Sequence, residues 1–236
     1  MERVGRVVAR TLERMRAAVC PGITTAELDD VAAAFMREEG ARSAPNLFYG
    51  FPGWTCISVN EEVVHGVPGS RTIAGGDLVT LDVTAELDGY VADAAVTVAV
   101  PPAAPLALAL RDCAEAAFWK AAGLVRAGAP LALVGGAVER EVRRRGFRVL
   151  RELSGHGVGR KIHEPPSVLN YHDARVRTRL TDGLVIALEP LISANTSWTR
   201  EMADGWTISS RNGSLTAHFE HTLVVQRDEP LLLTAA

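Results

Sequence analysis

Five residues that can ligate metal ions stand at spacings that one site could collect. They are Asp82, Asp93, His156, Glu189 and Glu220. Four carboxylates brought together cannot all stay ionised without a counter-charge, because like charges at close range raise each other's pKa values. Two divalent cations would supply that charge, and carboxylate-rich sites with histidine suit Mn, Fe, Co or Zn. The sequence therefore predicts a dinuclear metal hydrolase.

The two aspartates lie on either side of a turn signal. Asp-Gly at 88–89, between apolar strands, favours a two-residue hairpin loop. If residues 88–89 form the loop, residue 82 pairs with residue 95. Period-two alternation then puts Asp82 and Asp93 on one sheet face as diagonal neighbours. Taken alone, two strand aspartates would more simply be solvated surface charges. The apolar run 78–83 around Asp82 argues instead for a buried position.

The other three candidates each stand in a local pattern of their own. His156 is flanked by glycines within 154–159, which let the backbone approach a ligand closely, although such a histidine could equally serve a turn. Glu189 directly follows the apolar strand 185–188, where a charge is a poor packing choice. Glu220 precedes an apolar strand and carries less weight by itself. The joint pattern is more specific than its parts.

The elements that must position these residues are predicted by apolar periodicity. Helical spacing predicts helices at 4–19 and 110–125, each followed by a second helix, at 24–40 and 131–146. Thr24 and Glu27 have the spacing of a capping box. Strands are expected at 55–60, 77–87, 90–100, 184–188, 205–209 and 217–225.

The same order of elements in both parts of the chain suggests an internal repeat. An offset of 106 residues superposes the glycines that bracket the second helix of each part, Gly22 and Gly40 on Gly128 and Gly146. It carries Asp82 to one residue before Glu189. Amphipathicity alone would produce some apolar matches, but not the coincident glycines. We therefore expect an α+β fold over 1–236, with two pseudo-symmetric halves, about 1–102 and 103–236, forming one curved antiparallel sheet with helices on one face.

Composition sets mild bounds on partners and compartment. The chain has 236 residues, 47% of them hydrophobic, and a net charge of −3, which gives no electrostatic footprint for nucleic acid or a membrane surface. Its 3 cysteines imply no disulfide framework. No apolar run reaches the roughly 18 residues of a membrane span, and the first residues show no signal-peptide pattern. We expect a cytoplasmic monomer.

Several segments taken together resemble the type I methionine aminopeptidases, a family of pita-bread metallopeptidases, over nearly the full length. The segments that carry the resemblance are Cys56–Glu61, His65–Pro68, Leu81–Val83 with Asp93, Gly155–Gly159, His163–Pro166, Glu189–Pro190, Asp204–Thr207 and Phe219–Thr222. The two-half pita-bread fold that this resemblance implies agrees with the repeat.

The resemblance also implies roles for the chemistry-bearing residues. The five candidates would ligate two divalent ions, Co, Mn, Fe or Zn, bridged by a water of lowered pKa. That water would attack the carbonyl of an N-terminal Met that precedes a small residue in a peptide or nascent chain, and Glu189 would take its proton. His163 would lie by the scissile carbonyl and His65 by the peptide nitrogen, where both could bind substrate and stabilise developing charge.

A pocket for the methionine side chain is implied as well, because aromatic and sulfur contacts suit a thioether. The resemblance places there Phe48, Phe51, Cys56, Ile162 and Trp206. Each of these could instead be ordinary core, and His172, His218 and His221 receive only that ordinary interpretation.

Three positions depart from the family pattern. Pro45 and Ile162 stand where a Cys and a Phe are usual, so pocket selectivity should differ. Ala94 follows Asp93 where Thr or Ser is common, which would loosen the support of that ligand.

Two other functions compete with this one. An Xaa-Pro aminopeptidase or dipeptidase shares the fold, but such enzymes normally carry an additional N-terminal domain that 236 residues cannot hold. A pita-bread protein that only binds a partner would be expected to lack ligands, whereas all five are present here.

Overall fold

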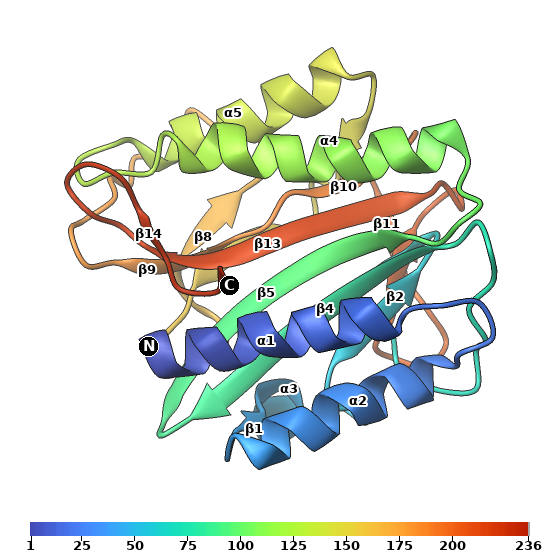
Figure 1. Cartoon of the computed structure of the whole chain (residues 1–236). Coiled ribbons are helices and arrows are strands. Elements are labelled where there is room, and N and C mark those ends of the chain that lie inside the picture. Colours follow the sequence, from blue (N-terminus) through green and yellow to red (C-terminus); the bar gives the residue numbers. More distant parts are fainter. Residues whose placement is uncertain (236) are drawn as a thin grey trace.

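The computed structural model describes residues 1–235, in which helices cover one face of a large sheet (Figure 1). The helices are α1 Glu2–Ala18, α2 Thr25–Glu38, α3 Ala44–Tyr49, α4 Pro105–Ala122 and α5 Leu131–Arg144. The strands are β1 Arg42–Ser43, β2 Cys56–Val59, β3 Glu62–Val64, β4 Leu78–Leu87, β5 Tyr90–Ala99, β6 Arg148–Val149, β7 Ser154–Gly157, β8 Glu164–Leu169, β9 Val185–Leu188, β10 Leu191–Ser193, β11 Thr199–Glu201, β12 Ile208–Ser210, β13 Thr216–Val224 and β14 Leu231–Leu232. None of the helices within 1–235 is both long and apolar enough to cross a membrane.

The main sheet joins the two halves of the chain edge to edge. Its strand order is β1-β4-β5-β13-β9-β7-β8, and neighbouring strands pair antiparallel. Strands β5 and β13 form the seam between the halves, with Ala95 opposite Glu220. Strands β11, β12 and β3 form a separate small sheet beside it. The expectation of an α+β fold, with one antiparallel sheet built from both halves, is confirmed.

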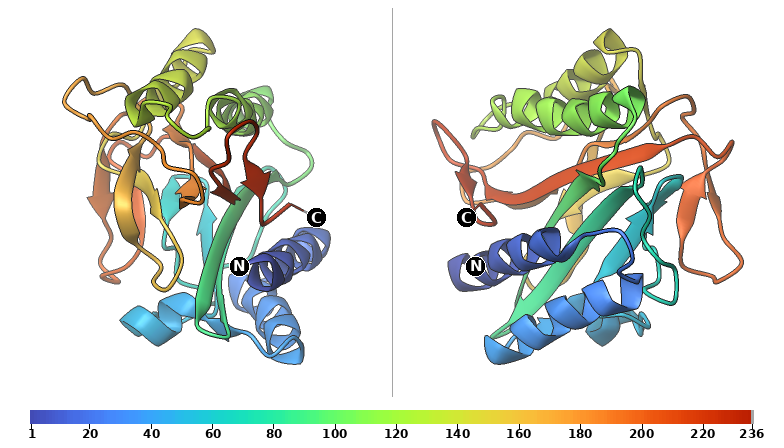
Figure 2. Two further views of the ribbon diagram at one scale, coloured as in Figure 1. Left: turned by 90° about the vertical axis from the view of Figure 1, so that its left-hand side faces the viewer. Right: turned by 45° about the vertical axis from the view of Figure 1, so that its right-hand side comes forward.

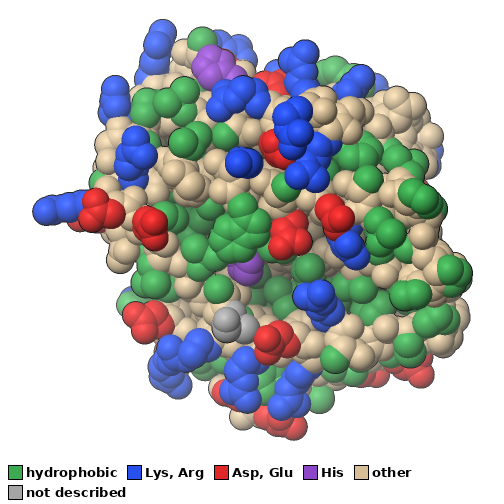
Figure 3. All heavy atoms as spheres, turned by 45° about the horizontal axis from the view of Figure 1, so that its top comes forward, with side chains coloured by type: hydrophobic (Ala, Val, Ile, Leu, Met, Phe, Trp, Pro, Cys, Tyr) green, Lys and Arg blue, Asp and Glu red, His purple; other side chains and the backbone are tan. Residues whose placement is uncertain are grey.

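Each half packs its sheet against its own helix pair, as two views from the side show (Figure 2). In the first half Val8 and Met15 of α1 share one apolar cluster with Leu81 of β4. In the second half Phe118 of α4 shares another with Leu223 of β13. Helical periodicity turns these residues to one side of each helix, so both helices bury their apolar stripes on the same sheet face. Charged side chains of both signs are interspersed on the face that Figure 3 shows.

The internal repeat is visible in the backbone hydrogen bonds. The Gly22 amide donates to the Ile73 carbonyl at 2.9 Å, and the Gly128 amide donates to the Leu180 carbonyl at 2.8 Å. Both glycines have positive φ, 97° and 83°, which side chains rarely tolerate. The offset is 106 residues at the glycines and 107 at their partners, so the second half holds one inserted residue. Asp82 therefore matches Glu189 in the structure.

Local elements follow the sequence closely where local signals are strong. The hairpin of β4 and β5 turns at 88–89 with φ values of 54° and 78°, and Asp82 lies opposite Ala95 as expected. The capping box of Thr24 and Glu27 starts α2. Two predictions are displaced. The helix expected at 110–125 is α4 at Pro105–Ala122, which begins with a proline in its first turn. The strand expected at 205–209 is β12 at Ile208–Ser210, because a turn over the preceding residues delays it.

Candidate active site

The predicted metal ligands lie on the sheet face opposite the helices. Leu81 and Val83 belong to the α1-side core, so the intervening Asp82 points to the other face. Ala95 lies opposite Asp82 on one side and opposite Glu220 on the other, which places two carboxylates across a single small side chain. The seam thus leaves space between carboxylates from the two halves.

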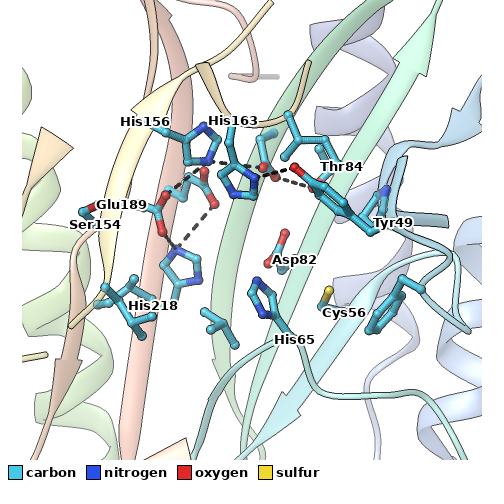
Figure 4. A pocket seen from close by; sticks show the side chains of 18 of the residues that line it. Tyr49, Cys56, His65, Asp82, Thr84, Ser154, His156, His163, Glu189 and His218 are labelled. Carbon is cyan, nitrogen blue, oxygen red and sulfur yellow. Dashed lines mark hydrogen bonds and ion pairs between the residues drawn. The ribbon is translucent and has the colours of Figure 1, made fainter. Parts of the chain in front are cut away.

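All five predicted ligands line one pocket. Asp82, His156 and Glu189 are labelled in the view of this pocket (Figure 4). One potential ligand atom each of Asp93, His156 and Glu220 lies within 4.8 Å of the others. His156 Nε2 is 3.4 Å from Glu189 Oε1 and 4.0 Å from Asp93 Oδ2. Thr84 Oγ1 donates to Asp93 Oδ1 at 2.8 Å and so fixes that carboxylate. The predicted convergence therefore occurs in the structure.

Burial governs the charge state of the site without metal. It raises the pKa values of Asp82, Glu189 and Glu220 well above their usual range, and neighbouring carboxylates raise them further. Burial also raises the pKa of Asp93 to about 6 and lowers the pKa of His156. Protons must therefore occupy part of this acidic cluster unless cations replace them.

The donor set fits divalent cations. Asp82 Oδ1 and Glu220 Oε1 are buried oxygens with no hydrogen-bond partner among the described residues. The Nδ1 atom of His156 lies 2.9 Å from the Gly157 carbonyl, so Nδ1–H donates there and Nε2 keeps its lone pair for a metal. Carboxylate oxygens with one imidazole nitrogen are ligands that Mn, Fe, Co or Zn accept.

Two further histidines face the same pocket from opposite halves. The His163 ring centroid is 4.4 Å from that of His156, and its Nδ1 lies 2.8 Å from the Tyr49 hydroxyl. His65 has a positive φ of 57°, a conformation common at functional sites. Burial lowers the pKa values of His65 and His163. Both rings are thus neutral hydrogen-bond donors near pH 7.

Apolar side chains wall the pocket on the side of β2 and α3. Phe51 is 1% exposed and meets Trp206 edge to face, with ring centroids 5.3 Å apart. Cys56 and Ile162 are also buried in the lining. The cavity measures about 160 Å³, room for one long side chain and its backbone ends. Pro45 lines the same wall.

Phe48 is not where the sequence comparison placed it. It is 41% exposed and does not line the pocket, whereas its neighbour Tyr49 does. The reason is the short helix α3: residues four apart share a helix face, so Pro45 and Tyr49 turn inward together and Phe48 turns away.

Ala94 was expected to loosen the support of Asp93, but the structure places its side chain elsewhere. Ala94 is fully buried in the α1-side core, so its side chain points away from the metal ligands. Asp93 is supported instead by Thr84, and its backbone is held by Thr222, whose hydroxyl accepts from the Asp93 amide at 2.9 Å.

His218 was given no role from the sequence, yet it lies in the pocket. Its Nε2 is 3.4 Å from Glu220 Oε2 and 3.8 Å from Glu189 Oε2. Burial lowers its pKa to about 3, so the ring is neutral. The signal that could have revealed it is alternation along β13, because residues two apart share a face and Glu220 had already been placed in the site.

Comparisons with known proteins agree with this geometry. The model of Metallopeptidase family M24 matches residues 1–227. Methionine aminopeptidase 2 of Bacillus subtilis is 41% identical over 236 residues, covering 99% of this chain and 95% of that protein. A solved methionine aminopeptidase from Thermotoga maritima matches with a TM-score of 0.97 at 33% identity, covering 100% of this chain and 95% of that one. A Pyrococcus furiosus prolidase shares the fold, with a TM-score of 0.80 at 20% identity; the match covers all of this chain but 62% of the prolidase.

Proposed function

The chain belongs to Metallopeptidase family M24, and on that premise we propose that it is a metal-dependent aminopeptidase that removes N-terminal methionine from peptides and nascent proteins. The observation that supports this most strongly is the pocket itself. It combines two buried carboxylate oxygens that have no hydrogen-bond partner among residues 1–235, a histidine whose Nε2 keeps its lone pair, and an apolar wall beside a cavity of about 160 Å³.

We propose that the site binds two divalent ions. The residues that would hold them are Asp82, Asp93, His156, Glu189 and Glu220. Bound ions would polarise the scissile carbonyl and make water a nucleophile near neutral pH. Every residue of this set comes from one chain, so a monomer contains the complete site, and we propose a single catalytic domain over 1–236 that works as a monomer.

We assign separate catalytic roles to Glu189 and to the other polar residues of the pocket. Glu189 is the general base. One of its oxygens faces His156 and the other faces His218, so one oxygen can take a proton while the other keeps its contact. His163 and His65 face the cavity as neutral donors and stabilise negative charge that develops on the carbonyl oxygen and near the peptide nitrogen. The Tyr49 hydroxyl orients the His163 ring.

The apolar wall selects the substrate. Phe51, Cys56, Ile162 and Trp206 surround the methionine side chain, for which aromatic and sulfur contacts are favourable. The substrate's free amine, in its uncharged form, would bind one of the ions that the acidic cluster holds. The residue after methionine must be small, because the histidines and carboxylates crowd the space beside the scissile bond.

One assay tests this function. Metal-free enzyme is loaded in turn with Mn²⁺, Co²⁺ or Fe²⁺ and offered Met-Ala, Met-Gly, Met-Glu and Ala-Pro peptides. We expect release of methionine from Met-Ala and Met-Gly alone. Cleavage of the Ala-Pro peptide in preference to Met-Ala would instead establish a prolidase-like activity, and metal binding with no cleavage of any peptide would indicate a binding protein.

A further inference from the structure

His218 is a fully buried histidine whose ring nitrogens have no hydrogen-bond partner among the described residues. It lies on β13 on the same face as Glu220, and its ring points into the pocket toward Glu189 (Figure 4). The proposed function assigns it no task. A histidine buried without partners is unfavourable in an apolar core, so its presence beside two carboxylates calls for a role.

The pseudo-twofold axis that relates the two halves makes the position of His218 equivalent to that of a predicted metal ligand, Asp93. The Thr222 hydroxyl accepts from the Asp93 amide and donates to the Asp93 carbonyl, at 2.9 and 2.7 Å. The Thr97 hydroxyl makes the same two bonds with His218, at 2.8 and 2.9 Å. His218 therefore occupies on β13 the position that Asp93 occupies on β5.

The chemistry at the two equivalent positions differs. Asp93 supplies oxygens that face His156, whereas the Nε2 atom of His218 faces oxygens of Glu189 and Glu220. Glu189 thus has one oxygen toward His156 Nε2 and the other toward His218 Nε2. An N–H group between two ionised carboxylates can donate to them, and it fixes which of their oxygens remain free for a cation.

Resting on the proposed metal-dependent function, we propose that His218 is a positioning residue: when ions are bound, its single Nε2–H donates a hydrogen bond shared by Glu189 and Glu220 and so holds their other oxygens toward the ions. Groups that hydrogen-bond to metal ligands typically change metal affinity by about 10–100-fold when they are removed.

A pair of variants of similar length isolates the donated hydrogen bond. His218→Gln keeps an N–H donor near the position of Nε2, whereas His218→Met keeps the volume and loses the donor. Calorimetric titration of the metal-free full-length protein with Mn²⁺ should show affinity within about 3-fold of the unaltered protein for His218→Gln, and about 10–100-fold weaker affinity for His218→Met. Equal affinity in all three proteins would overturn the proposal.

His221→Gln is the matched control. His221 lies on the opposite face of the same strand and bonds to the Thr234 hydroxyl at 2.9 Å, outside the metal pocket. Its substitution should leave Mn²⁺ affinity unchanged. If it weakened Mn²⁺ binding as much as His218→Met, the effect would belong to the strand rather than to His218, and the proposal would be wrong.

A measurement on the unaltered protein guards against variants that fail to fold. Nitrogen-15 NMR of the Zn²⁺-loaded protein, with labelled histidine, reports which ring nitrogen of His218 carries the proton. We expect Nε2–H. An unprotonated Nε2 would overturn the proposal and indicate direct metal ligation. The unaltered protein also separates the two claims. If it binds no divalent ion, the proposed function fails as well. If it binds metal and cleaves Met-Ala, but His218→Gln and His218→Met have the same Mn²⁺ affinity, only the role of His218 is overturned.

Discussion

The two halves of the molecule supply the same site by different routes. In the first half, both predicted ligands lie on one hairpin, Asp82 on β4 and Asp93 on β5, and a two-residue turn joins these strands. In the second half, His156 lies on β7, Glu189 directly follows the end of β9, and Glu220 lies on β13, so these ligands come from parts of the chain that are far apart. Equivalent backbone hydrogen bonds at Gly22 and Gly128 nevertheless show one common framework.

This contrast shows that the framework and the chemistry are separable. The repeated backbone fixes where side chains can stand, and Asp82 and Glu189 stand at equivalent places. Yet Asp93 is matched by His218, and Ala95 is matched by Glu220. The halves are alike in backbone and unlike in the groups they present, so the site has two distinct sides although its scaffold is nearly symmetric.

The sharpest test of that equivalence removes one carboxylate from each half. Asp82→Asn and Glu189→Gln should each lower metal affinity and Met-Ala turnover by more than about 100-fold, the upper range for losing a group that only orients a ligand. Calorimetric titration with Mn²⁺ and turnover at limiting Mn²⁺ check this. Asp29→Asn is the control, because that buried carboxylate accepts bonds from Trp54 and Thr55 outside the ligand set. Wild-type turnover in either site variant would disprove the metal assignment.

A second test compares the donors that the halves contribute. His163→Ala and His65→Ala should each lower the turnover number by about 10²–10³-fold, the usual cost of one lost transition-state donor. Metal content should stay near that of the unaltered enzyme, since neither ring is assigned as a ligand. Steady-state kinetics with parallel metal analysis decide the matter, and loss of metal from His163→Ala would make that residue a ligand.

The charge balance across the seam predicts a pH dependence of metal binding. Burial raises the pKa values of Asp82 and Glu220 well above normal and that of Asp93 to about 6. At pH 6 the metal-free folded site therefore holds protons that the unfolded chain has released, and cations must displace them. The rise in melting temperature caused by a fixed Mn²⁺ concentration should be larger at pH 8 than at pH 6. An equal or reversed effect would contradict the proposed protonation.

The smallest expected effect probes the shared framework. Gly22→Ala and Gly128→Ala should each lower the free energy of unfolding by about 1–2 kcal/mol, because each forces a side chain into left-handed backbone. Apart from chain neighbours, no atom of residues 1–235 lies within 4 Å of the place that a Cβ would take at either glycine, so these variants test backbone conformation alone. Gly123→Ala, at φ −63°, should be neutral or slightly stabilising. Urea denaturation of the metal-free variants measures all three, and unequal losses at Gly22 and Gly128 would weaken the equivalence.

Sequence reasoning succeeded where the physics is local. An Asp-Gly turn and period-two alternation set the register of Asp82 and Asp93, because the paired strands are adjacent in the chain. The capping box at Thr24 likewise depends on residues three apart. The segments that resemble a known family identified ligands in the second half that no local rule would have brought together.

Only the tertiary structure decided the positions that depend on distant partners. His218 enters the site because β13 pairs with both β5 and β9, and such pairing closes long loops that no local pattern specifies. Phe48 lies outside the pocket because the six-residue helix α3 turns its side chain away from the face that carries Pro45 and Tyr49. The sequence by itself thus determined the elements and the groups able to bind metal, since these follow from neighbours along the chain. Which side chains finally face one another was settled by the long-range strand order and by the orientation of each element against the rest.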